Sequence, residues 1–209
     1  MELELILSFI GASVLLTIMP GPDNIFVLTE SITKGHKNGI AISMGLVSGI
    51  LIHTLAAATG VSFIIQKSAT AFSIIKYLGA AYLFYLAIQA TKDKQPGIHI
   101  KAENNKAETS FLKLVQKGFF MNILNPKVSL FFIAFLPQFI SKEGFLYTYQ
   151  MIILGIIFML QAMLIFGTLS ILSGKLSSTL SSSRFWSITR WSKVGVLSIL
   201  GLTLALAKK

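Results

Sequence analysis

Two short polar segments, each containing proline, interrupt long apolar stretches of this chain. The first is Pro20-Gly21-Pro22-Asp23-Asn24, and the second is Asn125-Pro126-Lys127, with Asn122 just before it. Proline removes a backbone donor and clashes with the preceding turn, so each segment predicts a break in a helix. Backbone groups freed there need partners, and the half-helix beginning near Pro22 presents amide groups that suit a carboxylate. We therefore expect a binding site at the two breaks.

Asp23 is the acidic residue at the first break. On insertion scales a charged side chain at the centre of a membrane costs about 2.5–3.5 kcal/mol, and such residues are usually functional. A carboxyl group away from water can take up a proton, so Asp23 is a candidate for coupling to a proton gradient. The alternative is that Asp23 only caps the following half-helix, for which Asp is a preferred residue. The two roles can coexist.

Lys127 is the basic residue inside the predicted fourth span, far from either end of it. It could pair with Asp23, each charge offsetting the desolvation of the other, or it could extend toward the membrane surface. Asn122 and Asn125 could satisfy the broken backbone or bind substrate. His53 and Gln161, in the second and fifth spans, are weaker candidates, since helix–helix hydrogen bonding explains such residues.

The composition indicates a membrane protein. The chain is 54% apolar and only 12% charged, against about 25% charged in soluble domains, and its apolar stretches are long enough to cross a bilayer. The absence of cysteine excludes disulfides and thiolate metal sites, and the three histidines lack metal-ligand spacing, so we expect neither metal nor cofactor. The net charge of +10 lies in short loops, which favours membrane lipid rather than nucleic acid as partner.

We predict an all-α integral membrane protein forming a single membrane domain over residues 1–209. The six predicted spans are 5–32, 38–65, 70–91, 115–140, 146–172 and 186–207, and a serine-rich loop is expected over 173–183. The first span is expected to be a retained helix rather than a cleaved signal, because Glu2 and Glu4 precede it. Twelve Lys and Arg residues fall on one side and five on the other. This bias predicts both termini outside and residues 92–114 in the cytoplasm.

The two halves of the chain are similar in plan. Aligning Pro22 with Pro126 places Asp23 on Lys127, and an apolar run follows each. Residues 1–91 and 115–209 would then be two three-helix repeats, joined by the polar connection 92–114. An odd number of spans per repeat inverts the second copy, as in many secondary transporters. Helices one and four would each be broken near the membrane midplane.

Four motifs, in order, resemble the LysE/RhtB family of amino-acid exporters. They are Pro20-Gly21-Pro22-Asp23; the glycines Gly39, Gly45 and Gly49 with His53; Lys76-Tyr77-Leu78-Gly79-Ala80-Ala81-Tyr82-Leu83; and Gly118 with Asn122, Asn125-Pro126-Lys127, Phe131-Phe132 and Pro137-Gln138-Phe139. The resemblance implies efflux of amino acids or close derivatives, such as homoserine, threonine or leucine, across a prokaryotic cytoplasmic (inner) membrane. It also implies energy from a proton or membrane gradient. Many members carry an acid after the second-span glycine, where this chain has Ile50.

Three functions differ in how well they fit this pattern. In the first, an alternating-access exporter, the substrate carboxylate meets a half-helix N-terminus or Lys127, and the substrate amine meets Asp23 or a freed carbonyl. The second is a passive pore for small zwitterions. The third, a membrane-embedded enzyme, lacks a recognised catalytic set in the spans. The glycine-rich faces also leave a homodimer open.

Overall fold

The chain folds almost entirely into helices, as its apolar runs predict. The computed structural model describes residues 2–93, 110–141, 143–180 and 182–207, with backbone alone at 177–180. No strand occurs among these residues. Most of the predicted cytoplasmic connection, residues 94–109, lies outside the described residues, so its character stays a prediction.

The helices follow one another with short connections. The α-helices are α1 (Leu3–Ile18), α2 (Pro22–Lys34), α3 (His36–Ala56), α4 (Ser62–Lys67), α5 (Ala69–Thr91), α6 (Phe111–Ile123), α7 (Pro126–Leu130), α8 (Tyr147–Leu180) and α9 (Ser183–Leu206). Three short segments have other helical geometry: the wider π turns η1 (Ala57–Val61) and η2 (Phe131–Phe135), and the tighter 3-10 turn η3 (Leu136–Phe139). Because η1 joins α3 to α4 without a gap, the second predicted span is one continuous helical stretch.

Both predicted helix breaks are present. Helices α1 and α2 bend by 58° at the first break, and the segments on either side of the second bend by 51°. Pro22 and Pro126 are the first residues of α2 and α7, a position where the missing N–H is not needed. The side-chain oxygen of Asn125 caps α7 by accepting a hydrogen bond from Lys127 N at 3.0 Å. In each half of the chain, proline begins the second half-helix.

Helix length and composition support several membrane spans. Three described stretches are long and apolar enough to cross a membrane: His36–Lys67, Ala69–Thr91 and Tyr147–Leu176. Each of the two bent pairs adds a further candidate. The sixth predicted span, 186–207, lies in α9, which is not among the candidates found in the described chain. Arg184, Arg190 and Lys193 make the first half of α9 the least apolar part of it.

The predicted loop at residues 173–183 is wrong. Helix α8 continues to Leu180 and exceeds the predicted fifth span. Serine lowers helix stability only slightly relative to other polar residues. The Ser170 hydroxyl donates a hydrogen bond to Phe166 O, one turn earlier, at 2.9 Å. Ser170 and Ser173 are both buried against the bundle. A serine-rich sequence is therefore compatible with the end of a packed helix.

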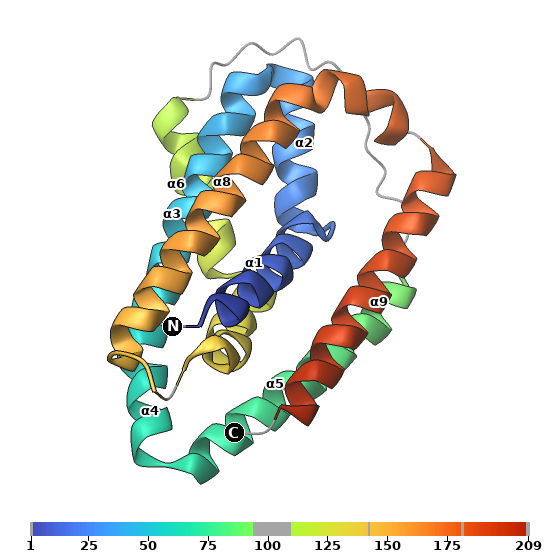
Figure 1. Cartoon of the computed structure of the whole chain (residues 1–209). Helices are drawn as coiled ribbons and strands as arrows, with labels where there is room; N and C mark the ends of the chain where they lie inside the picture. Colours follow the sequence, from blue (N-terminus) through green and yellow to red (C-terminus); the bar gives the residue numbers. More distant parts are fainter. Residues whose placement is uncertain (1, 94–109, 142, 181, 208–209) are drawn as a thin grey trace.

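Helix α3 packs on α6, on α8 and on α2 (Figure 1). Helices α1 and α2 pack on α8, and α5 packs mainly on α9. Gly45 of α3 and Gly118 of α6 bring two backbones together, because a Cβ on either would overlap the other helix at Val115 O or Ile42 O. The glycines of the second span therefore serve close helix packing.

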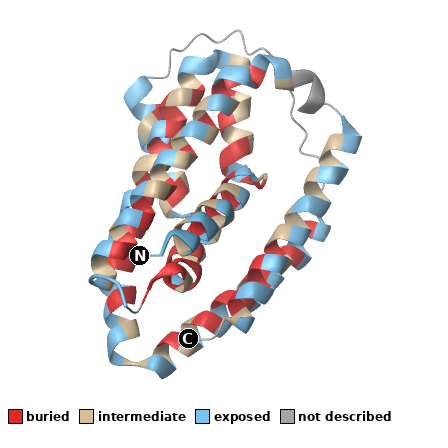
Figure 2. Ribbon diagram, in the orientation of Figure 1, coloured by how far each residue is buried: buried red, intermediate tan, exposed pale blue. Residues whose placement is uncertain are grey.

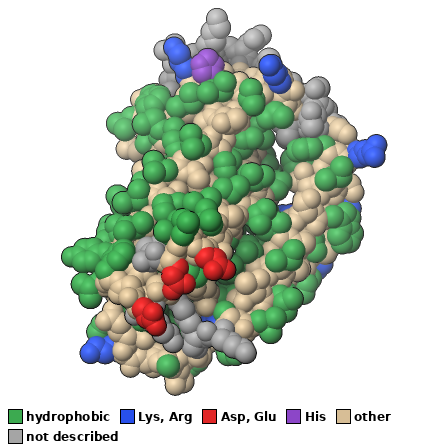
Figure 3. All heavy atoms as spheres, in the orientation of Figure 1, with side chains coloured by type: hydrophobic (Ala, Val, Ile, Leu, Met, Phe, Trp, Pro, Cys, Tyr) green, Lys and Arg blue, Asp and Glu red, His purple; other side chains and the backbone are tan. Residues whose placement is uncertain are grey.

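The outer surface is strongly apolar. Buried residues face the interior of the bundle (Figure 2), while large hydrophobic side chains such as Leu78, Leu160 and Leu164 are 66%, 63% and 71% exposed. Such side chains cover much of the face shown in Figure 3. Exposed apolar surface of this extent fits contact with lipid rather than with water.

Candidate functional site

The two helix breaks meet at one hydrogen bond inside the protein. Asn125 Nδ2 donates to Asp23 Oδ2 at 2.7 Å. Both residues are buried: Asn125 is 9% exposed and Asp23 is 3% exposed. A hydrogen bond to an ionised carboxylate is stronger than one between neutral groups. The corresponding segments of the two halves are thus joined directly, at the place where the sequence predicts a site.

Lys127 lies at the same place but contacts different atoms. Its Nζ donates to Leu16 O at 3.1 Å and to Met19 O at 3.4 Å. These are carbonyl groups at the C-terminal end of α1, where a helix has acceptors without internal partners and a partial negative charge. Lys127 therefore closes the end of α1 from the other half of the chain.

The structure does not contain the direct pairing of Asp23 with Lys127. No ion pair within 4.0 Å joins these two residues in the described chain, where the ion pairs are Lys34–Glu30 and Lys193–Asp93. The Asp23 carboxylate still attracts the Lys127 ammonium from a longer distance. The amide of Asn125 takes the position of the expected partner because it reaches Asp23 from the cap of α7, while Lys127 turns toward α1.

A chain of polar groups runs from the first break to α8. Asn24 Nδ2 donates to Thr17 O at 2.9 Å, and Gln161 Nε2 donates to Thr17 Oγ1 at 2.9 Å. The other side-chain oxygens, Asn24 Oδ1 and Gln161 Oε1, are buried without a hydrogen-bond partner. Gln161 thus forms the helix–helix bond expected of it. Thr17 was not a predicted site residue, because a lone threonine in an apolar run usually bonds within its own helix.

His53 and Asn122 form the second-break side of the site. His53 Nε2 donates to the backbone oxygen of Asn122 at 3.2 Å, and its ring lies 5.8 Å from that of Phe132 between centroids. Asn122 Oδ1 is buried and has no hydrogen-bond partner. His53 therefore holds α3 to α6, and the unpartnered amide oxygen of Asn122 faces the interior.

A small cavity lies between these groups. Its volume is about 10 Å³, which is about the smallest space that admits one water molecule. Its lining residues are Leu16, Thr17, Asp23, Ile50, Asn122, Lys127, Val128, Phe158 and Phe166. At this volume the cavity has no room for an amino acid. Ile50, which stands where the resemblance implies an acid in many members, forms part of its wall.

The remaining predicted site residues belong to the backbone of the breaks. Pro20, Gly21 and Pro22 line a second, larger cleft beside the first break. A Cβ on Gly21 would lie 3.6 Å from Lys127 Nζ. Pro126 is exposed and begins α7. These residues shape the break, while Asp23, Asn122, Asn125 and Lys127 supply the polar groups.

A polar cluster buried at two helix breaks in an apolar bundle is typical of a membrane transporter. Comparison with known families agrees with this class: the LysE type translocator family matches residues 14–208. The chain belongs to that family, which makes it a translocator rather than an enzyme.

Individual relatives cover about two thirds or more of the chain. An uncharacterized membrane protein YrhP of Bacillus subtilis (strain 168) is 36% identical over 77% of this chain and 79% of its own length. A homoserine/homoserine lactone efflux protein of Salmonella typhimurium is 32% identical over 68% of each chain. A membrane protein of Vibrio cholerae is 30% identical over 68% of this chain and 67% of its own. No solved structure matches the chain.

Proposed function

We propose that this protein is a secondary active exporter that carries amino acids or close derivatives out of a prokaryotic cell across the cytoplasmic membrane. The observation that carries the proposal is the buried Asn125–Asp23 hydrogen bond, which joins the two helix breaks. Family membership and the efflux proteins among the relatives support the substrate class. Alternating access needs two arrangements of the halves, and a contact that joins the halves is a place where the two arrangements can differ.

The packing of the helices supports two inverted three-helix repeats, with residues 1–91 and 115–209 as the two copies. The broken helix of the second half, α6, packs on α3, and the broken helix of the first half, α1 with α2, packs on α8. Helices α3 and α8 also pack together, as do α5 and α9, and each pair unites helices at equivalent positions of the two halves; α2 packs in addition on α3 within the first half. This exchange of partners is the pattern that a two-fold relation between the halves produces.

Charge distribution supports an orientation with the termini outside. The junction of α2 and α3 carries Lys34, His36 and Lys37. Figure 3 shows basic side chains and a histidine at one end of the molecule. The acidic side chains visible in that view lie toward the N-terminal end. By the positive-inside rule the basic end faces the cytoplasm.

Asp23 is the proposed coupling residue. As a carboxylate it can bind the substrate ammonium, and as a carboxylic acid it cannot. A proton that enters from outside would release the ammonium and later leave to the cytoplasm, so one proton exchanges for one substrate. The unpartnered oxygens of Asn24, Asn122 and Gln161 are further groups that the substrate can use.

Counterflow in proteoliposomes tests the proposal. Vesicles loaded with unlabelled leucine, homoserine or threonine should accumulate the labelled form faster than empty vesicles. Asp23→Asn, which keeps the shape and can still accept from Asn125, should remove acceleration driven by a proton gradient. Glu4→Gln, at an exposed residue near the N-terminus, is the matched control. Uptake without trans-stimulation would indicate a pore, and unaltered coupling in Asp23→Asn would remove Asp23 from the mechanism.

A further inference from the structure

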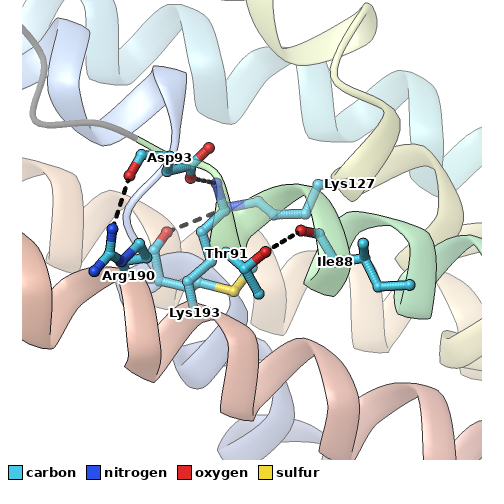
Figure 4. A network of polar contacts seen from close by, with 7 residues as sticks. Ile88, Thr91, Asp93, Lys127, Arg190 and Lys193 are labelled. Atoms are coloured by element: carbon cyan, nitrogen blue, oxygen red, sulfur yellow. Dashed lines mark hydrogen bonds and ion pairs between the residues drawn. The ribbon is translucent and has the colours of Figure 1, made fainter.

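A cleft with charged walls lies between the first helix break and α9. Its volume is about 250 Å³, far larger than that of the buried cavity. Its lining residues are Pro20, Gly21, Pro22, Ile25, Asp93, Trp186, Thr189, Arg190 and Lys193. None of its charged residues was predicted as part of the site, because Asp93 and the two bases of α9 are separated widely in sequence. Figure 4 draws these three residues together with Lys127.

The charged groups of the cleft include both signs. Lys193 Nζ forms an ion pair with Asp93 Oδ2 at 2.6 Å, and Arg190 Nη1 donates to Asp93 O at 3.5 Å. Arg190 Nε is buried and has no hydrogen-bond partner. A buried donor without an acceptor is unfavourable, so an anionic oxygen that reaches Nε would be stabilised there. The guanidinium group also favours carboxylates because of its planar set of donors.

An apolar hollow adjoins the charged cleft. It has a volume of about 330 Å³ and shares Pro20, Ile25, Trp186 and Thr189 with the cleft. Its other lining residues are Ile18, Asn24, Leu28, Ile165, Leu169, Leu176, Phe185, Ile188 and Ser192. A molecule with charged groups at one end and an aliphatic chain at the other therefore matches the two spaces together.

We propose that the cleft is a docking site for an aliphatic α-amino acid, separate from the buried cluster. Arg190 binds the carboxylate, Asp93 accepts from the ammonium, and the side chain lies against Ile25 and Trp186 in the apolar hollow. Asp93 can keep its bond to Lys193 meanwhile, because a carboxylate accepts several hydrogen bonds. This inference rests on the proposed function, to which it adds the site where substrate is collected.

The cleft and the buried cluster adjoin at the first break. Gly21 lines the cleft, and a Cβ on it would lie 3.6 Å from Nζ of Lys127, which lines the buried cavity. The charge of Lys193 also acts on that of Lys127. A change in the angle between α1 and α2 would therefore connect the docking site with Asp23. Both sites use the break, the cleft from the side of α9 and the cluster from the side of α7.

Fluorescence of Trp186 provides the test. Trp191→Phe leaves Trp186 as the single tryptophan of the chain. In detergent-solubilised protein, leucine should change this fluorescence with saturation. Three analogues should each bind at least tenfold more weakly. Leucinamide lacks the carboxylate, 4-methylpentanoate lacks the ammonium, and homoserine carries a hydroxyl in place of the branched apolar end of the side chain.

Variants separate the docking site from the buried site. Arg190→Gln should weaken leucine binding at least tenfold and Arg190→Lys by less, while Arg184→Gln, the same charge change on an exposed residue of α9, should leave it within twofold. Asp23→Asn should impair proton-coupled counterflow, whereas the leucine concentration that half-saturates the Trp186 fluorescence change should stay within twofold. Unchanged binding in both Arg190 variants would overturn the proposal, as would equal loss in Asp23→Asn. Leucine binding that persists without any counterflow would support the docking site while refuting the exporter.

Discussion

Replacing Asn125 with alanine removes two interactions at the junction of the halves. The side chain donates to Asp23 Oδ2 at 2.7 Å and accepts from Lys127 N at 3.0 Å. A hydrogen bond to a charged group contributes about 1.5–3 kcal/mol, and an N-cap about 1 kcal/mol. We therefore expect Asn125→Ala to lower the free energy of unfolding by about 2.5–4 kcal/mol.

A double-mutant cycle isolates the bond to Asp23. In an Asp23→Asn background the bond joins two neutral amides and contributes about 0.5–1.5 kcal/mol. Asn125→Ala should then cost about 1–1.5 kcal/mol less than it does opposite aspartate. Reversible unfolding with sodium dodecyl sulfate in mixed micelles, followed by circular dichroism, measures each corner of the cycle.

Two further variants control for other causes. Asn125→Ser keeps a good N-cap but not the reach to Asp23, so it should lose only the larger contribution. Ser129→Ala removes a hydrogen bond of 3.2 Å to Asn125 O in the same segment, and it should cost no more than about 1.5 kcal/mol. If Asn125→Ala cost less than Ser129→Ala, or the cycle showed no coupling, the bond would not join the two halves as we argue.

Three other changes test the remaining parts of the structure. Lys127→Met should lower the free energy of unfolding by about 2–4 kcal/mol, because Leu16 O and Met19 O lose a charged donor. Lys127→Arg should recover part of this free energy in the same unfolding assay. Equal losses of stability in the two variants would show that the hydrogen bonds to α1 are unimportant. Gly45→Ala should destabilise the protein by about 1–3 kcal/mol, because the new methyl group overlaps α6. Gly11→Ala should be neutral or stabilising, since nothing lies within 4 Å of the new Cβ. A change in stability of the same sign in both variants would contradict the packing of α3 on α6. Lys76→Met should release the end of α9, because Lys76 Nζ donates a hydrogen bond to Ala207 O at 2.8 Å. The rate of amide hydrogen exchange near residue 206 should then increase at least fivefold. Lys67→Met, the control, should leave this rate unchanged.

The local features of the fold could be predicted from the sequence. Pro22 and Pro126 begin half-helices because proline cannot continue a preceding helix, whatever surrounds it. The glycines of α3 likewise allow close packing wherever the partner helix lies. The end of α8 was misplaced because serine does not by itself terminate a helix and the packing of Ser170 and Ser173 could not be known.

The pairing of side chains could not be predicted from the sequence. Asp23 bonds to Asn125 rather than Lys127 because the cap geometry of α7 brings the amide closer. Thr17 joins the site only because α8 places Gln161 beside it. The cleft of Asp93 and Arg190 likewise depends on how α9 packs against α5. Residue types indicated a polar site, and tertiary contacts decided its partners.

Alternating access requires that the cavity between the breaks open to each side of the membrane in turn. Val128 is 4% exposed and lines this cavity, and the chain has no cysteine, so Val128→Cys introduces a single thiol there. A membrane-impermeant thiol reagent should label it from outside in right-side-out vesicles and from inside in inverted ones, and a reversed proton gradient should shift the balance of the two rates. Labelling from one side only, whatever the gradient, would contradict alternating access.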